Sequence, residues 1–386
     1  MNKNNTRYRR SAFIRICIAN LLLYSSLYTL LPVIPAIMYS TTDSYSIQQV
    51  ALHLFYFIGG VALIGPFLFY IQDKYQRKSI AIFSYLGVSV STFLCKWINL
   101  ETAPFILILY GVFCTIATSI GITIAVDVSP SEKRNLGNKI VSWTGRFGFL
   151  IGIILCCFLL PSQYNSTLIY TSATLPLLAV TFILTIKLHF RAPMDSSLLH
   201  LDRFLLIKSW PFMINLMVVA IVISSTIALF YHLASTKIPP LYYLMVLIGG
   251  YLSSGFIVFS FIQRIQNKLF IQTLLGILCI GISYPLFAIP EFPYLPNYLL
   301  GLGIGLIVPE FLSLFVKIST HCQRGTANTS QSISWEIGLI LGIISYYYVQ
   351  ASEINTLHFI ITAGIFSVVF FLLVSYPYFI HNKLRK

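Results

Sequence analysis

The sequence contains few charged residues. Asp, Glu, Lys and Arg make up 9% of its 386 residues, against about 25% in soluble globular domains. Acidic residues are the scarcer class, with 11 Asp and Glu against 25 Lys and Arg, which gives a formal net charge of +14. Hydrophobic residues make up 57%, and no soluble fold could hide that much apolar surface from water. We therefore expect the chain to lie in a lipid bilayer, where each crossing needs about 20 apolar residues.

Several patterns that support catalysis are also missing. The seven cysteines form no Cys-x-x-Cys pair, so we interpret them as small packing residues rather than as a disulfide or zinc framework. The sequence has no glycine-rich phosphate-binding loop, no metal-binding cluster and no arrangement typical of a catalytic nucleophile. We therefore expect neither enzymatic activity nor ATP-driven transport, and we expect no cofactor and no metal.

Hydrophobic runs separated by helix breakers predict twelve membrane spans. Each span must be a helix, because every backbone polar group in a bilayer needs a partner within the protein. The expected spans are residues 13–38, 47–71, 80–99, 103–126, 139–161, 166–188, 207–233, 239–262, 269–289, 295–318, 328–350 and 356–380.

Lysine and arginine are distributed unevenly between the loops on the two sides of these spans. One set of loops and both termini hold 22 of the 25 basic residues, and the remaining three are Lys96, Arg146 and Lys237. The opposite loops carry acidic residues such as Glu101 and Glu291. The positive-inside rule then predicts a multi-pass protein of the cytoplasmic (inner) membrane with both termini in the cytoplasm. This asymmetry explains the net charge without nucleic acid. Attraction of the basic N-terminus to anionic lipids is an alternative.

The second half of the sequence repeats the first. Glycines recur 190 positions later along several spans, and the pairs include Gly60 and Gly250, Gly111 and Gly301, Gly148 and Gly338, and Gly152 and Gly342. The first span of each half fits an offset of 195, which aligns Asn20 with Asn215. We expect an all-α membrane protein of twelve transmembrane helices in two pseudo-symmetric six-helix bundles, residues 1–188 and 207–386, joined by a cytoplasmic connector at 189–206. Such duplication is typical of transporters, whose substrate site lies between the repeats near the bilayer midplane.

Three stretches resemble motifs of the major facilitator superfamily. The loop Asp73–Lys78 is similar to the D-R-x-G-R-R/K element of that family, and Asp127–Gly137 is similar to its D-L-x-P-x-x-R-R-G-x-G element. The segment Gln323–Gly338 resembles the Q-R-G-x-A-N … D-x-G-x-G run of drug-antiporter-like bacterial members, with Glu336 in place of the usual aspartate. With the topology and the repeat, the resemblance covers essentially the whole chain and implies the major facilitator fold.

The sequence departs from the family pattern at several positions. Phe69 stands where a glycine is usual before the first motif, and Ile153 replaces the proline that efflux members carry in helix 5. The fourth span, residues 103–126, contains no Lys or Arg, so the arginine that many members carry there is missing. These departures leave solute uptake and a role without transport open as alternatives to efflux.

The resemblance implies that charged side chains at the cytoplasmic face form a latch that breaks and reforms as the two halves rock. The expected latch residues are Asp73, Lys74, Arg77, Lys78, Asp127, Arg134 and Arg324. The alternative is that these charges only anchor the loops at the cytoplasmic surface, and both interpretations can hold together.

The resemblance also implies that helices 1, 4, 7 and 10, in chain order, line a central cavity. The side chains expected to bind a solute there, by ring stacking and hydrogen bonds, are Asn20, Tyr24, Tyr28, Tyr110, Asn215, Asn297 and Tyr298. The first three follow one another at four-residue spacing and therefore share one helix face. The alternative is that these side chains hold helices together, as polar residues in membranes often do.

Three charged residues lie well inside the expected spans: Arg146, Glu310 and Glu336. An arginine at the centre of a membrane helix costs about 2.5–3.5 kcal/mol on insertion scales, so it needs a partner or water. Arg146 and Glu336 lie 190 positions apart and occupy equivalent places in the repeat. We expect a network in which a carboxylate takes up and releases protons while Arg146 holds the opposite charge. A static ion pair is the alternative, and the choice of Glu310 or Glu336 as the partner of Arg146 stays open.

Together these patterns predict a secondary active transporter that moves a small organic solute across the membrane by alternating access, with proton-coupled efflux favoured. The first alternative is a proton-coupled symporter that takes up a sugar or another metabolite. The second alternative is a membrane sensor or scaffold that transports nothing. The expected partners are the solute, protons and the lipid bilayer, with no nucleic acid, and we expect a monomer.

Overall fold

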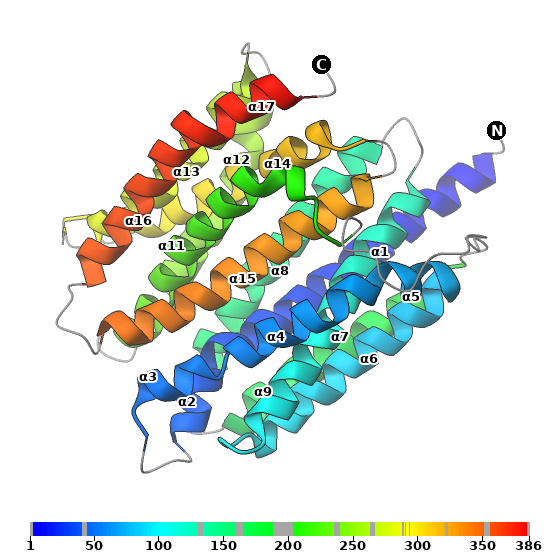
Figure 1. Cartoon of the computed structure of the whole chain (residues 1–386), viewed down its shortest axis with the longest axis horizontal. Coiled ribbons are helices and arrows are strands. Elements are labelled where there is room, and N and C mark those ends of the chain that lie inside the picture. Colours follow the sequence, from blue (N-terminus) through cyan, green and yellow to red (C-terminus); the bar gives the residue numbers. More distant parts are fainter. Residues whose placement is uncertain are drawn as a thin grey trace. The chain divides into compact units, whose positions relative to one another are not determined.

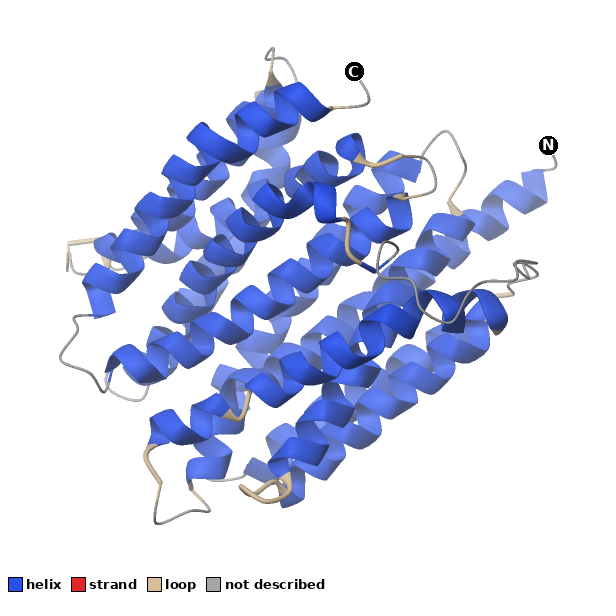
Figure 2. Cartoon of the chain, in the orientation of Figure 1, coloured by secondary structure: helices blue, strands red, loops and turns tan. Residues whose placement is uncertain are grey.

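Helices make up all the regular structure in the part of the chain that the structure describes. The computed structural model describes residues 3–40, 45–129, 134–159, 165–187, 204–234, 240–262, 267–287, 289, 291–292, 294–320, 323–350 and 356–383. Within these ranges there is no strand (Figure 2). This agrees with the physical expectation that only helices satisfy their own backbone hydrogen bonds when they cross a bilayer singly.

Twelve helical segments among the described residues are long and apolar enough to cross a membrane. They are Arg10–Tyr39, Ile47–Lys74, Arg77–Trp97, Ala103–Val128, Leu136–Leu159, Ser166–Leu184, Ile207–Ile227, Tyr242–Ser260, Lys268–Leu286, Leu295–Ile318, Gly325–Val349 and Leu357–Asn382. Each overlaps one of the twelve predicted spans, so the prediction of a twelve-span membrane protein is confirmed.

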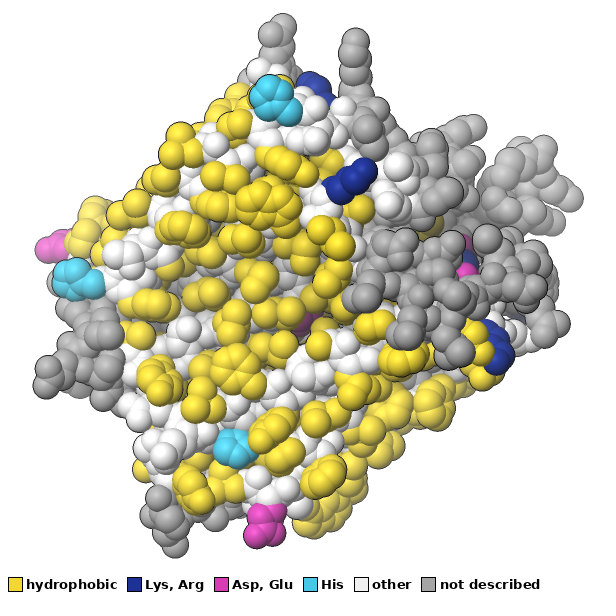
Figure 3. Space-filling model, in the orientation of Figure 1, with side chains coloured by type: hydrophobic (Ala, Val, Ile, Leu, Met, Phe, Trp, Pro, Cys, Tyr) yellow, Lys and Arg dark blue, Asp and Glu magenta, His cyan; other side chains and the backbone are white. Residues whose placement is uncertain are grey.

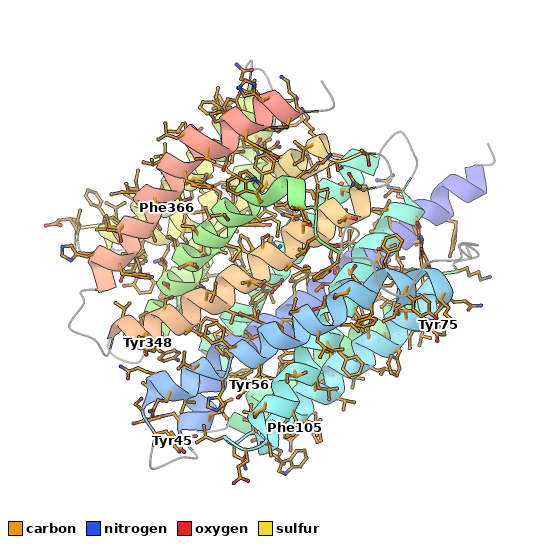
Figure 4. The ribbon with its side chains drawn as sticks, viewed as in Figure 1. Tyr45, Tyr56, Tyr75, Phe105, Tyr348 and Phe366 are labelled. Atoms are coloured by element: carbon orange, nitrogen blue, oxygen red, sulfur yellow. The ribbon has the colours of Figure 1, made fainter. Side chains whose placement is uncertain are left out.

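The outer surface is apolar, as a lipid-facing surface must be. Hydrophobic side chains are spread over the described part of the face shown in Figure 3, and charged side chains are sparse there. Large rings such as Phe105 and Phe366 are 78% and 49% exposed and project from their helices (Figure 4). Exposing such rings to water would be unfavourable, whereas contact with the hydrocarbon chains of lipids is not.

The chain divides into two compact units, Met1–Leu205 and Leu206–Lys386. The connector expected at 189–206 lies largely outside the described residues. The helices of the first unit are α1 (Lys3–Leu30), α2 (Ile34–Tyr39), α3 (Ile47–Leu52), α4 (Phe55–Ile64), α5 (Leu68–Lys74), α6 (Arg77–Leu94), α7 (Ala103–Val128), α8 (Arg134–Leu159) and α9 (Asn165–Leu184). Within this unit α1 packs against α8 and α9, α4 packs against α7, and α6 packs against both α7 and α9 (Figure 1).

The second unit contains seven described helices. They are α11 (Trp210–Ala234), α12 (Pro240–Ser260), α13 (Lys268–Leu286), α14 (Leu295–Ile318), α15 (Arg324–Gln350), α16 (Thr356–Phe370) and α17 (Tyr376–Asn382). Within this unit α11 packs against α15 and α16, α12 against α14, and α13 against α14 and α16. A π-helical turn at Phe371–Ser375 joins α16 to α17.

Proline interrupts the second span of the first unit. The helix α4 ends at Ile64, a 3-10 turn follows over Gly65–Phe67, and α5 begins at Leu68. Pro66 lies in this turn. Proline lacks an N–H group and its ring collides with the carbonyl four residues earlier, which disfavours a regular α-helix at this point. The span consists of α3, α4 and α5, and the proline turn separates the last two.

The predicted repeat is visible in the helix contacts. In the first unit a Cβ atom added to Gly60 would collide with the carbonyl oxygen of Ile108, which is how closely α4 and α7 approach each other. In the second unit Gly250 meets Tyr298 in the same way, where α12 contacts α14. Both residues of the second pair lie 190 positions after those of the first. The offset of 190 therefore relates contacts between helices as well as residue types.

The first helix of each unit follows a different offset from the one predicted. Gly152 accepts a hydrogen bond from Thr29 Oγ1 at 3.3 Å, where α8 packs on α1. Gly342 accepts one from Ser225 Oγ at 3.1 Å, where α15 packs on α11. Thr29 and Ser225 are 196 positions apart. The predicted offset of 195 is therefore wrong by one residue, and the contacts align Ala19, rather than Asn20, with Asn215.

Candidate functional site

The cytoplasmic latch predicted from the sequence contains one ion pair among the described residues. Arg77 Nη1, at the start of α6, donates a hydrogen bond to Asp127 Oδ2, near the end of α7. The two side chains are 16% and 24% exposed, so water only partly screens the attraction. The ion pair joins the loop after the second span to the end of the fourth span. Its breaking and reforming during transport stays a prediction.

A buried glutamine strengthens the same junction. Gln72, the residue before Asp73 in α5, donates from Nε2 to Ser119 Oγ at 2.8 Å and accepts at Oε1 from Thr123 Oγ1 at 3.3 Å. Both hydroxyls belong to α7. Because Gln72 is 7% exposed, these hydrogen bonds are shielded from competing water. They fix the end of α5, and with it the partly buried Asp73, against α7.

The remaining cations expected in the latch have other partners or lie outside the described side chains. Lys74 donates to the hydroxyl of Tyr70 on its own helix. Lys78 Nζ donates to the carbonyl oxygen of Leu184 at 2.7 Å, at the C-terminus of α9, where a positive charge complements the helix dipole. The side chains of Arg134 and Arg324 lie outside the described part.

An aromatic cluster lies along the face of α1 that the sequence predicted. Tyr24 and Tyr28 have nearly parallel rings, with centroids 6.2 Å apart and an interplanar angle of 10°. Phe149 of α8 meets Tyr28 edge to face, with centroids 4.6 Å apart. Both tyrosines are at most 3% exposed. The cluster therefore occupies the contact between α1 and α8.

Arg146 belongs to this cluster. Its guanidinium carbon lies 5.1 Å from the centroid of the Tyr24 ring, and its side chain is 2% exposed. A cation over an aromatic face is attracted by the ring quadrupole, most strongly where water is excluded. The sequence predicted Arg146 as a functional charge but sought its partner among carboxylates. The contact with Tyr24 crosses from α8 to α1, so spacing within one helix could not reveal it.

The two buried glutamates lie in the second unit. Glu310 in α14 is 6% exposed and Glu336 in α15 is 7% exposed. Gln331 Nε2 of α15 donates to the carbonyl oxygen of Val308 in α14 at 3.4 Å, so a hydrogen bond links the two helices that carry the glutamates. Pairing of either glutamate with Arg146 stays a prediction.

The other predicted cavity residues lie in contacts between helices. Tyr110 of α7 meets Phe57 of α4 edge to face at 5.3 Å. Asn215 Nδ2 of α11 donates to the carbonyl oxygen of Ser367 in α16 at 2.9 Å. Tyr298 Oη of α14 donates to Ser253 Oγ of α12 at 2.9 Å. The two hydrogen bonds are of the kind expected where polar side chains hold helices together, and solute binding by these residues stays a prediction. Asn297, the last predicted cavity residue, is fully buried in α14.

Asn20 has neighbours that the sequence did not predict. Its Oδ1 atom lies 3.0 Å from the point where a Cβ atom of Gly121 in α7 would stand, and the hydroxyl of Tyr85 in α6 lies 3.2 Å from that point. On the other side, Asn20 Nδ2 lies 3.6 Å from the equivalent point of Gly145 in α8, against which the ring of Tyr24 also packs. Asn20 is thus held between two glycines on different helices.

Metal chemistry has no support in the described ranges. Within them, no group of three or more His, Cys, Asp or Glu side chains is arranged so that it could hold a metal ion. The arrangement that the structure does provide is a buried set of aromatic rings, an amide and a guanidinium within the first unit, and two buried carboxyl groups within the second. Aromatic rings offer stacking surface, and amide and guanidinium groups offer hydrogen bonds.

Comparison with known proteins identifies the fold. Residues 16–343 match the sequence model of the Major Facilitator Superfamily. The crystal structure of an auto-inhibited POT family peptide transporter is similar over 97% of this chain and 98% of its own, with a TM-score of 0.67 and 12% sequence identity. The structure of the nucleoside transporter NupG is similar over 96% of this chain and 100% of its own, with a TM-score of 0.64 and 17% identity. No curated protein sequence matches the chain.

Proposed function

The chain belongs to the Major Facilitator Superfamily and is a secondary transporter rather than an enzyme, and from this premise we propose that it exports a small organic solute in exchange for protons. Transport proceeds by alternating access, in which the two units rock around a bound solute. The membrane is the cytoplasmic membrane, and both termini lie on its cytoplasmic side.

The observation that carries the solute proposal is the buried cluster around Arg146. The ring of Tyr24 lies against its guanidinium, and Asn20 lies four residues before Tyr24 on the same face of α1. Rings offer stacking surface, the amide offers hydrogen bonds, and the guanidinium offers a positive charge. These groups suit a small amphipathic molecule with a flat or apolar part and a polar part.

Buried carboxyl groups support the proton exchange. Glu310 and Glu336 are almost inaccessible to water, and a charged carboxylate at such a place is unfavourable in a membrane. Taking up a proton removes that charge, so protonation and the exposure of the site to one side become linked. Arg146 holds the opposite charge in this proposal and sets which state of the carboxyl group is favoured.

Uptake of a solute is the second candidate function. The efflux proline is replaced by Ile153 in helix 5, and the two similar structures carry the names of a peptide transporter and a nucleoside transporter. Peptides and nucleosides are therefore among the first solutes to test.

The test is solute-dependent proton flux in proteoliposomes that contain the purified chain and a trapped pH-sensitive dye. The probes are ethidium, uridine, dialanine and D-glucose, each added to one side. The proposal expects at least one probe to move protons across the membrane, and it expects Arg146→Ala and Glu336→Gln to abolish that movement. Proton flux that is unchanged in both variants would refute the coupling and leave transport intact. The absence of flux and of solute movement with every probe would refute transport.

A further inference from the structure

We propose that Asn20 and Tyr85 form a polar subsite beside Gly121 that binds an O–H or N–H group of the transported solute. The proposal rests on the proposed transport function and deepens it, since it names the chemical group that the first unit recognises. Tyr85 and Gly121 have no part in the latch or in the coupling charges.

The geometry of three helices brings the subsite together. Asn20 comes from α1, Tyr85 from α6 and Gly121 from α7. The Asn20 Oδ1 atom and the Tyr85 hydroxyl oxygen lie 3.0 and 3.2 Å from one common point, the place of the missing Cβ atom of Gly121. Both oxygens therefore lie within reach of a single neighbouring group. Any side chain larger than hydrogen at position 121 would press on both of them.

Neither oxygen has a hydrogen-bond partner within the described part of the chain. Asn20 is 1% exposed and Tyr85 is fully buried, and both atoms are inaccessible to bulk water. Buried polar groups in folded proteins are nearly always hydrogen-bonded, so two orphaned oxygens at one place call for an explanation. Packing alone does not provide one, because a phenylalanine and a leucine would fill the same volume without the cost of desolvating the oxygens.

The chemistry of the two oxygens determines what can bind. An amide oxygen only accepts hydrogen bonds, whereas a phenolic hydroxyl donates and accepts. The ligand must therefore bring a donor to Asn20. An O–H group can donate to Asn20 and accept from Tyr85 at once, whereas an NH₂ group can donate one hydrogen to each oxygen. Asn20 Nδ2 and the ring of Tyr24 both lie near the place of the missing Cβ atom of Gly145, and the guanidinium of Arg146 lies against that ring. A solute whose donor group occupies the subsite would place its remaining part toward this ring and this charge.

Such a site discriminates strongly between related solutes. A pocket built to hydrogen-bond a hydroxyl or amine rejects the analogue that lacks it, because its own polar groups then stay buried and unpaired. We expect solutes with a donor at the right place to bind about tenfold tighter than analogues in which that donor is replaced by hydrogen or methyl.

The experiment is a cycle that removes the hydrogen bond from the protein, from the solute and from both. The probes are uridine, D-glucose and dialanine with their deoxy or N-methyl analogues. Binding is measured by thermal stabilisation of the purified full chain in detergent, and transport is measured in proteoliposomes. The variants are Tyr85→Phe, which removes only the hydroxyl, and Gly121→Ala, which adds a methyl group between the two oxygens.

Two control variants make the same chemical changes at positions outside the subsite. Ser91→Ala removes another buried hydroxyl of α6, one that donates to Val88 within its own helix. Gly59→Ala adds the same methyl group as Gly121→Ala, at a position with no other atom within 4 Å. We expect both controls to bind and transport every probe as the wild type does.

The expected result is specific to one donor of one probe. Tyr85→Phe weakens binding of the parent probe about tenfold but leaves the analogue without that donor unchanged, and Gly121→Ala also weakens binding of the parent. Equal loss for parent and analogues would show a structural effect and overturn the proposal. Binding as in the wild type in both variants would show that the solute does not contact these two oxygens, and would overturn the proposal too.

The same experiment separates the subsite from the transport function. A probe that binds but does not cross the membrane would refute transport, while the cycle on binding still decides about the subsite. A probe that crosses the membrane with no effect of Tyr85→Phe or Gly121→Ala would refute the subsite alone. A wild-type chain that neither binds nor transports any probe would overturn both proposals.

Discussion

Two neighbouring glycines of α4 allow a sharp test of the helix packing. A Cβ atom added to Gly60 would lie 3.0 Å from the carbonyl carbon of Ile108 and 3.1 Å from its Cα atom, and it would overlap the carbonyl oxygen. These are backbone atoms of α7, which cannot rotate away as a side chain would. A Cβ atom added to Gly59 would have no other atom within 4 Å. Gly60→Ala should therefore separate α4 from α7, and Gly59→Ala should not.

The expected magnitude follows from the contact. Overpacking a tight contact by one methyl group costs about 1–3 kcal/mol, and for a compact unit of this size each kcal/mol lowers Tm by roughly 2–4 °C. Gly59→Ala carries no such cost, and alanine favours a helix over glycine by up to about 1 kcal/mol. Gly60→Ala should thus lower Tm by several degrees, whereas Gly59→Ala should leave it unchanged or raise it.

The assay is thermal unfolding of the purified chain in detergent, followed by the loss of monodisperse protein on size exclusion. The repeat extends the test to the second unit, where Gly250 meets the backbone of Tyr298 and Gly249 has nothing within 4 Å. Gly250→Ala should behave like Gly60→Ala, and Gly249→Ala like Gly59→Ala. If Gly60→Ala and Gly59→Ala had equal Tm values, or Gly250→Ala and Gly249→Ala did, the close glycine contact that recurs in each half would be refuted.

Three further predictions concern the charged groups. Arg146→Lys keeps the charge but loses the planar guanidinium over Tyr24, so solute transport should fall, though less than in Arg146→Ala, and equal rates in the two variants would count against the ring contact. Asp127→Ala should lower the free energy of unfolding by about 1 kcal/mol or less, because the ion pair with Arg77 is partly exposed, and it should therefore lower Tm only slightly but slow transport clearly. Swapping the two charges should restore the rate, and a swap that restores nothing would refute the latch. Glu336→Gln cannot release a proton, so its transport rate should be independent of the pH gradient while solute exchange persists, and a rate that still follows the gradient would assign the proton to another group.

Most of the fold could be predicted from the sequence because the signals for it are local. A span of about 20 apolar residues is visible wherever it occurs, and the positions of the twelve spans follow from such runs. The repeat was also visible, since glycines at tight helix contacts cannot be replaced without a collision, as at Gly60 and Gly250. The predicted alignment was wrong for the first helix of each half, where matching Asn20 with Asn215 placed the two helices one residue out of register. Residue type suggested that match, and only the contacts between helices correct it.

The candidate site could be predicted only in part. Arg146 was conspicuous because a charge is rare in an apolar run, and Tyr24 was conspicuous because it follows Asn20 by one helical turn. Tyr85 and Gly121 gave no such signal, because a single tyrosine and a single glycine are ordinary residues in membrane helices. They lie next to Asn20 only because α1, α6 and α7 come together in the fold. The spacing of residues along one helix does not reveal the distance to another helix.

The central claim is that the chain uses a proton gradient to move a solute, and concentrative transport tests it most directly. Proteoliposomes that contain the purified chain and equal concentrations of a radiolabelled probe on both sides are given a pH gradient, and the internal probe is measured over time. The account predicts that the probe becomes more concentrated on the acidic side, in exchange for protons, and that a protonophore abolishes the difference. Equal concentrations on both sides with every probe, while the gradient persists, would contradict it.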